Sequence, residues 1–158
     1  MNMIEGEIAG NGRRFALVVA RFNHFVTEPL LDGAVEALRE YGVAEDDITV
    51  ARVPGTFELP PLALRLAKSG RFDAIIAIGA VIRGGTPHFD YVAAEAARGT
   101  ADVAMQTGLP VAFGILTCDN VEQAVERAQE GPSNKGYEAA LAALEMADLQ
   151  RKLGLDGL

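Results

Sequence analysis

The sequence contains no tryptophan and a single cysteine among its 158 residues. One cysteine, Cys118, can form neither an internal disulfide nor a zinc site built from paired cysteines, so we expect it to be a small buried apolar residue. Long apolar runs are also absent, since no stretch approaches the roughly 20 residues that cross a bilayer. The N-terminus, MNMIEGEIAGNGRR, lacks the basic start and apolar run of a secretory signal. We therefore predict a cytoplasmic protein.

Positive charge is scarce as well, because 14 lysines and arginines stand against 22 aspartates and glutamates, giving a formal net charge of -8. A surface that binds nucleic acid or an anionic membrane needs clustered cations, so this balance argues against both kinds of partner. Any anion site must be local. The hydrophobic share of 49% and the chain length fit one globular domain spanning residues 1–158.

Four short apolar runs alternate with longer stretches whose apolar residues recur every three or four positions. The runs, which we predict to be strands, lie at residues 15–20, 48–53, 74–81 and 111–116. Strands that alternate with helices predict a parallel four-stranded sheet with helices on both faces. The expected fold is therefore α/β, a three-layer α/β/α sandwich. The segment before the first strand reads as an additional extended piece, whose partner strand the sequence does not identify.

Local signals predict where the first three helices begin and end. The first helix is expected to begin near Thr27, with Pro29 in its first turn, and to stop at Gly42. Two prolines at 60–61 fit only the opening turn of the second helix. Thr86 is expected to cap the third helix.

The last two helices bring two cations toward one edge of the sheet. Asp119 followed by Glu122 resembles a capping box that opens the fourth helix, which bears Arg127. The apolar stripe of this helix is expected to comprise Val121, Ala124, Val125 and Ala128. The last helix is predicted from about Lys135 to Leu153. Arg127 and Lys135 either hold an anionic substrate or form surface ion pairs with neighbouring glutamates.

Ligands of an open parallel sheet bind beyond the carboxyl ends of its strands, so the loops after the strands are the candidate sites. After the first strand come Phe22 and Phe25, whose rings indicate either a flat ligand or hydrophobic cover for the sheet edge. After the second strand, Glu58 lies near a helix N-terminus, where a carboxylate either caps the helix or binds ligand hydroxyls.

The loop at residues 82–88, IRGGTPH, is the most informative by residue chemistry. Its paired glycines allow close backbone approach, and its exposed amides with Arg83 nearby suit a phosphate, although a tight structural turn is the alternative. His88 follows directly, and its imidazole either transfers protons near neutral pH or is merely structural.

Five segments carry a resemblance to a known family: ARFN, VPGTFELP, GAVIRGGTPHFDYVA, FGILTCDNVEQAVERA and NKGYEAALAALEMA. In this order they resemble the successive signature segments of the lumazine synthases, and the likeness covers nearly the whole chain. Each segment lies at a loop where the expected fold places ligands.

The resemblance implies the site residues. Those for the pyrimidinedione ring and ribityl chain of one substrate are Phe22, Thr56, Phe57, Glu58, Ala80, Val81, Ile82 and, from a neighbouring subunit, Phe113. Those for the phosphate of the other substrate are Gly85, Thr86, Lys135 and, from a neighbouring subunit, Arg127. His88 is implied as the proton-transfer residue. Gly85 and Cys118 depart mildly from the family pattern, and the contact implied at Gly85 is made by the backbone.

The implied reaction condenses 5-amino-6-(D-ribitylamino)uracil with 3,4-dihydroxy-2-butanone 4-phosphate, giving 6,7-dimethyl-8-ribityllumazine, phosphate and water, with no metal and no cofactor. The family also implies a homo-oligomer, a pentamer, and riboflavin synthase as a further partner. The short stretch at 127–135 is similar to that of relatives whose pentamers pack into icosahedral shells.

Two other functions are compatible with the same flavodoxin-like fold. One is a flavin- or lumazine-binding module without turnover, and the other is a shell protein whose role is to form a compartment. His88, Arg127 and Lys135 together favour the enzyme. A simple flavodoxin-like module would also carry a glycine-containing phosphate loop after the first strand, where this chain has the bulky sequence RFNH.

Overall fold

A central sheet of four parallel strands organises the computed structural model, which describes residues 1–157. The strands, in the spatial order β2-β1-β3-β4, are β1 (Phe15–Ala20), β2 (Ile48–Val53), β3 (Ala74–Ile82) and β4 (Val111–Cys118). All of β1 and nearly all of β3 are buried, because helices cover both faces of these central strands. The predicted parallel sheet is confirmed, and Cys118 is buried as expected. Leu158, the last residue of the expected domain, lies outside the described residues.

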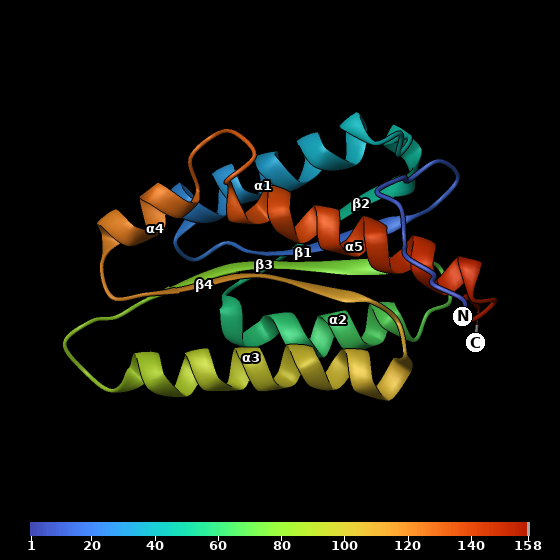
Figure 1. Cartoon of the computed structure of the whole chain (residues 1–158). Coiled ribbons are helices and arrows are strands. Elements are labelled where there is room, and N and C mark those ends of the chain that lie inside the picture. The colour runs from blue at the N-terminus through green and yellow to red at the C-terminus, as the bar shows by residue number, and fades with distance from the viewer. Residues whose placement is uncertain (158) are drawn as a thin grey trace.

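Five α-helices of the described chain cover the two faces of the sheet (Figure 1). One face carries α1 (His24–Glu40), α4 (Val121–Arg127) and α5 (Lys135–Lys152), and the other carries α2 (Leu59–Ala67) and α3 (His88–Thr107). Single turns of 3-10 helix, η1 (Glu45–Asp47) and η2 (Thr56–Glu58), precede β2 and α2. The three-layer α/β/α sandwich is therefore confirmed. None of the helices within residues 1–157 combines the length and the apolar character needed to cross a membrane.

The first helix begins three residues earlier than predicted, at His24 instead of Thr27, so Pro29 lies inside the helix and not in its first turn. The main-chain N–H groups of Val26 and Thr27 donate to the Asn23 carbonyl at 2.9 and 3.0 Å. Val26 is fully buried in the core, and this apolar contact draws another turn into the helix. Proline has no main-chain N–H, so one carbonyl near the start of the helix has no helical donor. Water can donate a hydrogen bond to this carbonyl instead.

Two predicted helix caps are shifted by one residue. The N-cap of α3 is Pro87 instead of Thr86, and no described side chain caps its first turn. The N-cap of α4 is Asn120, whose side-chain oxygen accepts a hydrogen bond from the Gln123 N–H at 2.9 Å. Gln123 in turn accepts a bond from the Asp119 N–H at 2.8 Å. A carboxamide pair thus replaces the predicted acidic box, because Asn120 has the extended backbone that an N-cap needs.

The apolar stripe predicted for α4 is only half buried. Ala124 and Ala128 belong to the core, whereas Val121 and Val125 expose 47% and 45% of their surface. The helix follows β4, which is an edge strand, so the single chain has no further strand of the sheet on which these valines could pack. Their exposure leaves apolar surface at this edge of the molecule.

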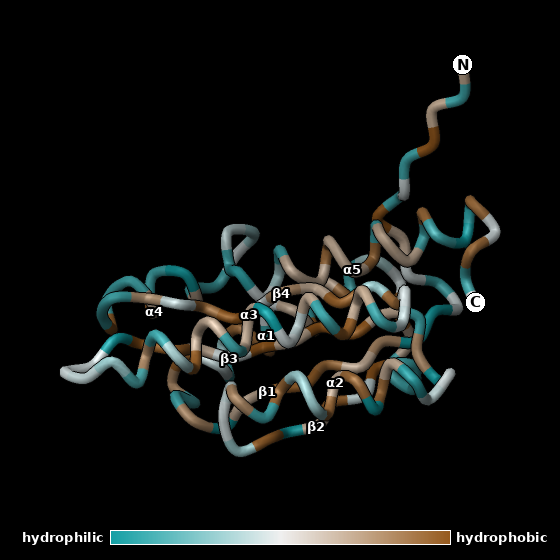
Figure 2. The backbone as a smooth tube through the Cα atoms, turned by 90° about the horizontal axis from the view of Figure 1, so that it is seen from below, coloured by the Kyte–Doolittle hydropathy of each residue, from teal (hydrophilic) through white to brown (hydrophobic). Residues whose placement is uncertain are grey.

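The N-terminal arm, residues 1–13, forms no strand in the described structure and is tied to α5 by Asp148. The buried Asp148 carboxylate accepts hydrogen bonds from the Glu7 N–H at 2.8 Å and from Arg13 at 3.1 Å, and it pairs with Lys152 at 3.3 Å. The Glu7 N–H foremost, together with Arg151 and Lys152, lowers the pKa of Asp148 to about 2. Figure 2 shows the first residues of the arm projecting from the body of the protein.

The strand order reverses between β1 and β3, because the chain passes from β1 to β2 on one side and then returns to the other side of β1. The helices that follow β1 and β3 lie on opposite faces, which opens a crevice at the carboxyl ends of these strands. Asn23 bridges the two strand ends, since its side-chain amide donates to the Ala80 carbonyl at 2.8 Å. The topology therefore places a ligand site here.

Candidate active site

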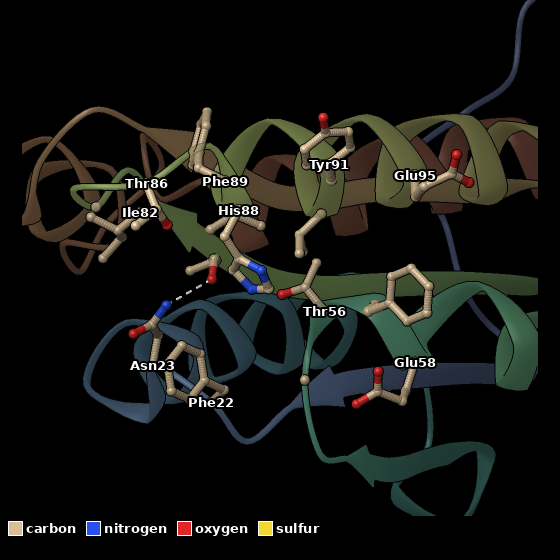
Figure 3. A pocket seen from close by; sticks show the side chains of 16 residues that line it. Phe22, Asn23, Thr56, Glu58, Ile82, Thr86, His88, Phe89, Tyr91 and Glu95 are labelled. Atoms are coloured by element: carbon tan, nitrogen blue, oxygen red, sulfur yellow. Dashed lines mark hydrogen bonds between the residues drawn. The ribbon is translucent and has the colours of Figure 1, made fainter.

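A cavity of about 760 Å³ opens at this crevice, where loops and the start of α3 surround it (Figure 3). The predicted residues that line this carboxyl-edge cavity are Phe22, Thr56, Phe57, Glu58, Ala80, Val81, Ile82, Thr86 and His88. Gly85 lies between two of the lining residues, Gly84 and Thr86. One cavity thus brings together residues from three loops that are far apart in the sequence.

Phe22 stands at the rim of the cavity because Asn23 turns the chain sharply. Asn23 has a left-handed backbone (φ 61°), the only positive φ of a non-glycine residue within 1–157, and asparagine tolerates this conformation better than most residues. Its bond to the Ala80 carbonyl fixes the turn. The Phe22 ring, which is 71% exposed, is therefore presented to the cavity, where a flat ligand can stack on it.

Thr56 and Glu58 reach the cavity from η2, which packs closely against β3. A Cβ added at Gly79 of β3 would meet the Thr56 hydroxyl at 2.8 Å, so glycine is what allows this approach. Glu58 is the N-cap residue of α2, yet its side chain forms no cap hydrogen bond in the described structure. Figure 3 shows its carboxylate on the same side of the cavity as the Phe22 ring. Of the two alternatives for Glu58, the geometry favours ligand binding over capping.

His88 is the first residue of α3, and its imidazole points toward Thr56 (Figure 3). Three more residues of α3, Tyr91, Val92 and Glu95, follow it at the spacing of one helix face and line the same cavity. That spacing from His88 could have identified them in the sequence. The lining residues that sequence reasoning missed are Asn23, Gly55, Gly84, Phe89, Tyr91, Val92 and Glu95.

Arg83, in the loop between β3 and α3, interacts with three neighbouring side chains. It bonds Asp119 at 3.1 Å and Asp90 at 3.2 Å, and its guanidinium lies 4.4 Å from the centre of the Phe89 ring. The hydrogen bond to Asp119 raises the pKa of the guanidinium. Arg83 therefore braces this loop, and its nearness to a phosphate stays a prediction.

A second hollow, of about 500 Å³, lies between β4, α4 and α5. Phe113, Arg127 and Lys135 line it, and among the described residues none lines both hollows. Arg127 donates to the Gln123 carbonyl at 3.0 Å and forms no ion pair with any residue of 1–157. Lys135 pairs with Glu138 at 2.9 Å. The predicted phosphate cations therefore lie together, but apart from the cavity of the same chain.

The two hollows differ in charge, although Glu138, the ion-pair partner of Lys135, also lines the second one. The carboxyl-edge cavity contains Glu58 and Glu95, and none of the residues that the described chain contributes to it is lysine or arginine. The second hollow supplies Arg127 and Lys135. Residues 1–157 contain no group of three or more His, Cys, Asp or Glu side chains placed to hold a metal ion.

Comparison with known proteins identifies one family along most of the chain. The family model of 6,7-dimethyl-8-ribityllumazine synthase matches residues 12–151. A protein of that name from Anaeromyxobacter dehalogenans (strain 2CP-C) is 58% identical over 153 residues, which cover 97% of this chain and 94% of that protein. Another of the same name, from Desulfatibacillum aliphaticivorans, is 54% identical over 147 residues, which cover 93% of this chain and 95% of that protein. With both hollows inside the matched region, the chain belongs to the 6,7-dimethyl-8-ribityllumazine synthase family.

Proposed function

We propose that this protein condenses 5-amino-6-(D-ribitylamino)uracil with 3,4-dihydroxy-2-butanone 4-phosphate to form 6,7-dimethyl-8-ribityllumazine, the product for which its family is named. The observation that carries the proposal is the carboxyl-edge cavity, which is lined by His88 and by the residues other than Phe113 that the family resemblance assigns to the pyrimidine. Membership of the family over residues 12–151 supports the same reaction.

The cavity suits the pyrimidine substrate. The exposed Phe22 ring offers a stacking surface for the flat pyrimidinedione. The Glu58 carboxylate accepts hydrogen bonds from the ribityl hydroxyls, and residues 80–82 form the wall at the end of β3. Holding this substrate in one pose beside the second supplies proximity, which is a large part of the rate enhancement for a bimolecular condensation.

His88 carries the proton transfers of the proposed reaction. Imine formation, elimination of phosphate and ring closure each move a proton, and an imidazole can give or take one near neutral pH. His88 is exposed within the cavity and points toward Thr56 (Figure 3). Its role is to exchange protons with the condensing amine and ketone, and the reaction needs no covalent bond to the enzyme.

The proposed site needs more than one copy of the chain. The cations Arg127 and Lys135 line the second hollow, which is separate from the cavity within one chain. A head-to-tail contact that sets the second hollow of one copy against the cavity of the next joins them and can close into a ring. The exposed Phe113, Val121 and Val125 supply apolar surface at this edge. We therefore include a homo-oligomer, a pentamer, in the proposal, whereas the icosahedral shell, riboflavin synthase as a partner and the cytoplasmic location stay predictions.

Turnover with both substrates tests the reaction. Purified protein is incubated anaerobically with the two substrates, and the product is identified by absorbance, fluorescence and chromatography. The expected result is 6,7-dimethyl-8-ribityllumazine above the uncatalysed background. If folded, oligomeric protein forms none, the proposed function is wrong, and titration with flavin and lumazine then tests the non-catalytic binding module.

Mixing two impaired variants, assayed with the phosphate-bearing substrate well below the KM of Arg127→Ala, tests the shared site. His88→Ala removes the proton-transfer group of the cavity, and Arg127→Ala removes a phosphate cation of the second hollow. If a neighbour supplies Arg127, random co-assembly of equal amounts restores both groups at about a quarter of the sites. A site formed within one copy gives no such recovery.

A further inference from the structure

Asn134 is a buried residue between α4 and α5 whose side chain has four hydrogen-bond partners, and only 2% of its surface is exposed. Its Oδ1 accepts from the main-chain N–H groups of Gly136 at 2.8 Å and Tyr137 at 3.0 Å. Its Nδ2 donates to the carbonyls of Pro29 at 3.2 Å and Ala128 at 3.0 Å. A single carboxamide therefore caps the start of α5 and ties it both to α1 and to the end of α4.

The backbone around this carboxamide is packed without spare space. A Cβ added at Gly33 of α1 would lie 2.3 Å from the Asn134 Oδ1, and a Cβ added at Gly136 would lie 1.9 Å from the Leu30 carbonyl oxygen. Both distances are too short for real atoms, so α1 approaches the start of α5 only because these two positions are glycine. The carboxamide is thus held from several sides.

The two cations of the second hollow stand at the two points that Asn134 fixes. Arg127 is the last residue of α4, directly before Ala128, whose carbonyl accepts from Asn134. Lys135 is the first residue of α5, directly after Asn134. The connection at 129–133 consists of bends and turns, so the hydrogen bonds of Asn134 bridge it. The backbone at both cations is therefore tied to this one side chain.

We infer that Asn134 is a positioning residue for the phosphate site, because it fixes the backbone from which Arg127 and Lys135 extend. The inference rests on the proposed function for the identity of the phosphate-bearing substrate. Charged donors held in place bind an anion more tightly than the same donors on a mobile turn, because less conformational entropy is lost on binding. A merely structural role would lower stability and leave the phosphate affinity of the folded protein unchanged.

Two variants disturb the carboxamide in different ways. Asn134→Ser retains an oxygen that can cap α5 but removes both donors, and it adds no charge near the cations. Gly33→Ala leaves the carboxamide intact and displaces it, because the new methyl group would lie 2.3 Å from Oδ1. Calorimetric titration of the assembled oligomer with inorganic phosphate is the readout. We expect each variant to weaken phosphate binding about tenfold, while the KM of the pyrimidine substrate changes less than about twofold.

The matched control is Thr100→Val. Thr100 is also buried, its hydroxyl has no hydrogen-bond partner within the described chain, and it does not line the second hollow. This variant is expected to bind phosphate like the wild type, whereas Arg127→Ala is the positive control for loss of binding. Circular dichroism and size-exclusion chromatography identify the variants that fold and assemble. Should Gly33→Ala fail to assemble, the comparison is made with Asn134→Ser alone.

Assembled variants that bind phosphate with wild-type affinity would overturn the inference, since Asn134 would then be structural only. A wild-type oligomer that binds no phosphate would overturn it as well. A different measurement tests the proposed function. If the wild type forms no lumazine, the proposed function is wrong, whatever the phosphate titrations show.

Discussion

The carboxyl-edge cavity, of about 760 Å³, is lined by aromatic rings and by Glu58 and Glu95, whereas the second hollow, of about 500 Å³, carries Arg127 and Lys135. The larger one suits a flat neutral ring bearing hydroxyl groups, and the smaller one suits a phosphate. Among the described residues, the cavity offers Thr86 but no cation to a phosphate, and the second hollow offers the two cations. On the proposed function, catalysis therefore requires a contact between two copies of the chain.

Replacing His88 should have the largest effect on activity. This effect should come from the cavity and leave the second hollow and the assembly unchanged. In His88→Ala we expect kcat to drop about a hundredfold or more, because a positioned proton-transfer group is lost, with the KM of both substrates and the assembly unchanged. Steady-state kinetics and size-exclusion chromatography check this. His24→Ala is the control, since His24 is the other histidine, is exposed and does not line the cavity. A loss of affinity without loss of kcat would contradict the role of His88.

Arg127→Ala should affect the KM of one substrate only, which would show that the two hollows bind different substrates. We expect the KM of the phosphate-bearing substrate to rise about 10- to 100-fold, the range for losing a charged hydrogen bond, and the KM of the pyrimidine to change less than about twofold. Arg39→Ala is the matched control, because Arg39 pairs with Glu45 on the exposed surface of α1. Equal loss of affinity for both substrates would contradict the role of Arg127 in binding the phosphate.

Phe22→Ala should give the reverse pattern, with a smaller effect. Loss of the stacking surface is expected to raise the KM of the pyrimidine about tenfold and to leave the phosphate-bearing substrate unaffected. Phe25→Ala is the control, since Phe25 is exposed near the same strand end but does not line the cavity. If Phe25→Ala weakens the pyrimidine as much as Phe22→Ala does, both rings merely cover the sheet edge.

Asp148→Asn lies outside both hollows, so it should change stability and no kinetic constant by more than about twofold. The pKa of Asp148 is lowered from 3.8 to about 2, which means that its charge stabilises the fold above pH 3.8 and that this stabilisation is lost as the pH falls to about 2. Urea unfolding from pH 7 to pH 2 should therefore show the wild type more stable than the variant at neutral pH and the difference closing over this acid range. A difference that persists unchanged at the lowest pH would contradict the role of the charge.

The strands could be predicted well because a strand that is buried on both faces consists of a continuous run of apolar residues, as at 15–20 and 74–81. Helix starts could not be predicted as closely. The start of α1 depends on the left-handed backbone of Asn23 and on the packing of Val26, and both are set by the rest of the fold. At α4, Asp119 and Asn120 are both good caps by residue type, and only the backbone conformation decides between them.

The loop residues of the candidate site could be predicted because the loops follow strands whose carboxyl ends meet at one edge. The contribution of α3 was missed, although Tyr91, Val92 and Glu95 share a helix face with His88. The separation of Arg127 from the cavity cannot be derived from the order of residues alone, since it depends on the strand order that puts β4 at the edge of the sheet. The resemblance, which assigns Arg127 to a neighbour, agrees with this separation.

A newly synthesised copy carries its cavity before it meets a neighbour. The described residues of this cavity include Glu58 and Glu95 but no cation, so one copy alone holds a phosphomonoester less firmly than a neutral ring with hydroxyl groups. On the proposed function, the pyrimidine can therefore load first, and the ketone phosphate has to wait for the Arg127 that a second copy supplies. Assembly would in this way set the order in which the substrates enter and keep the reactive ketone out of an unfinished site.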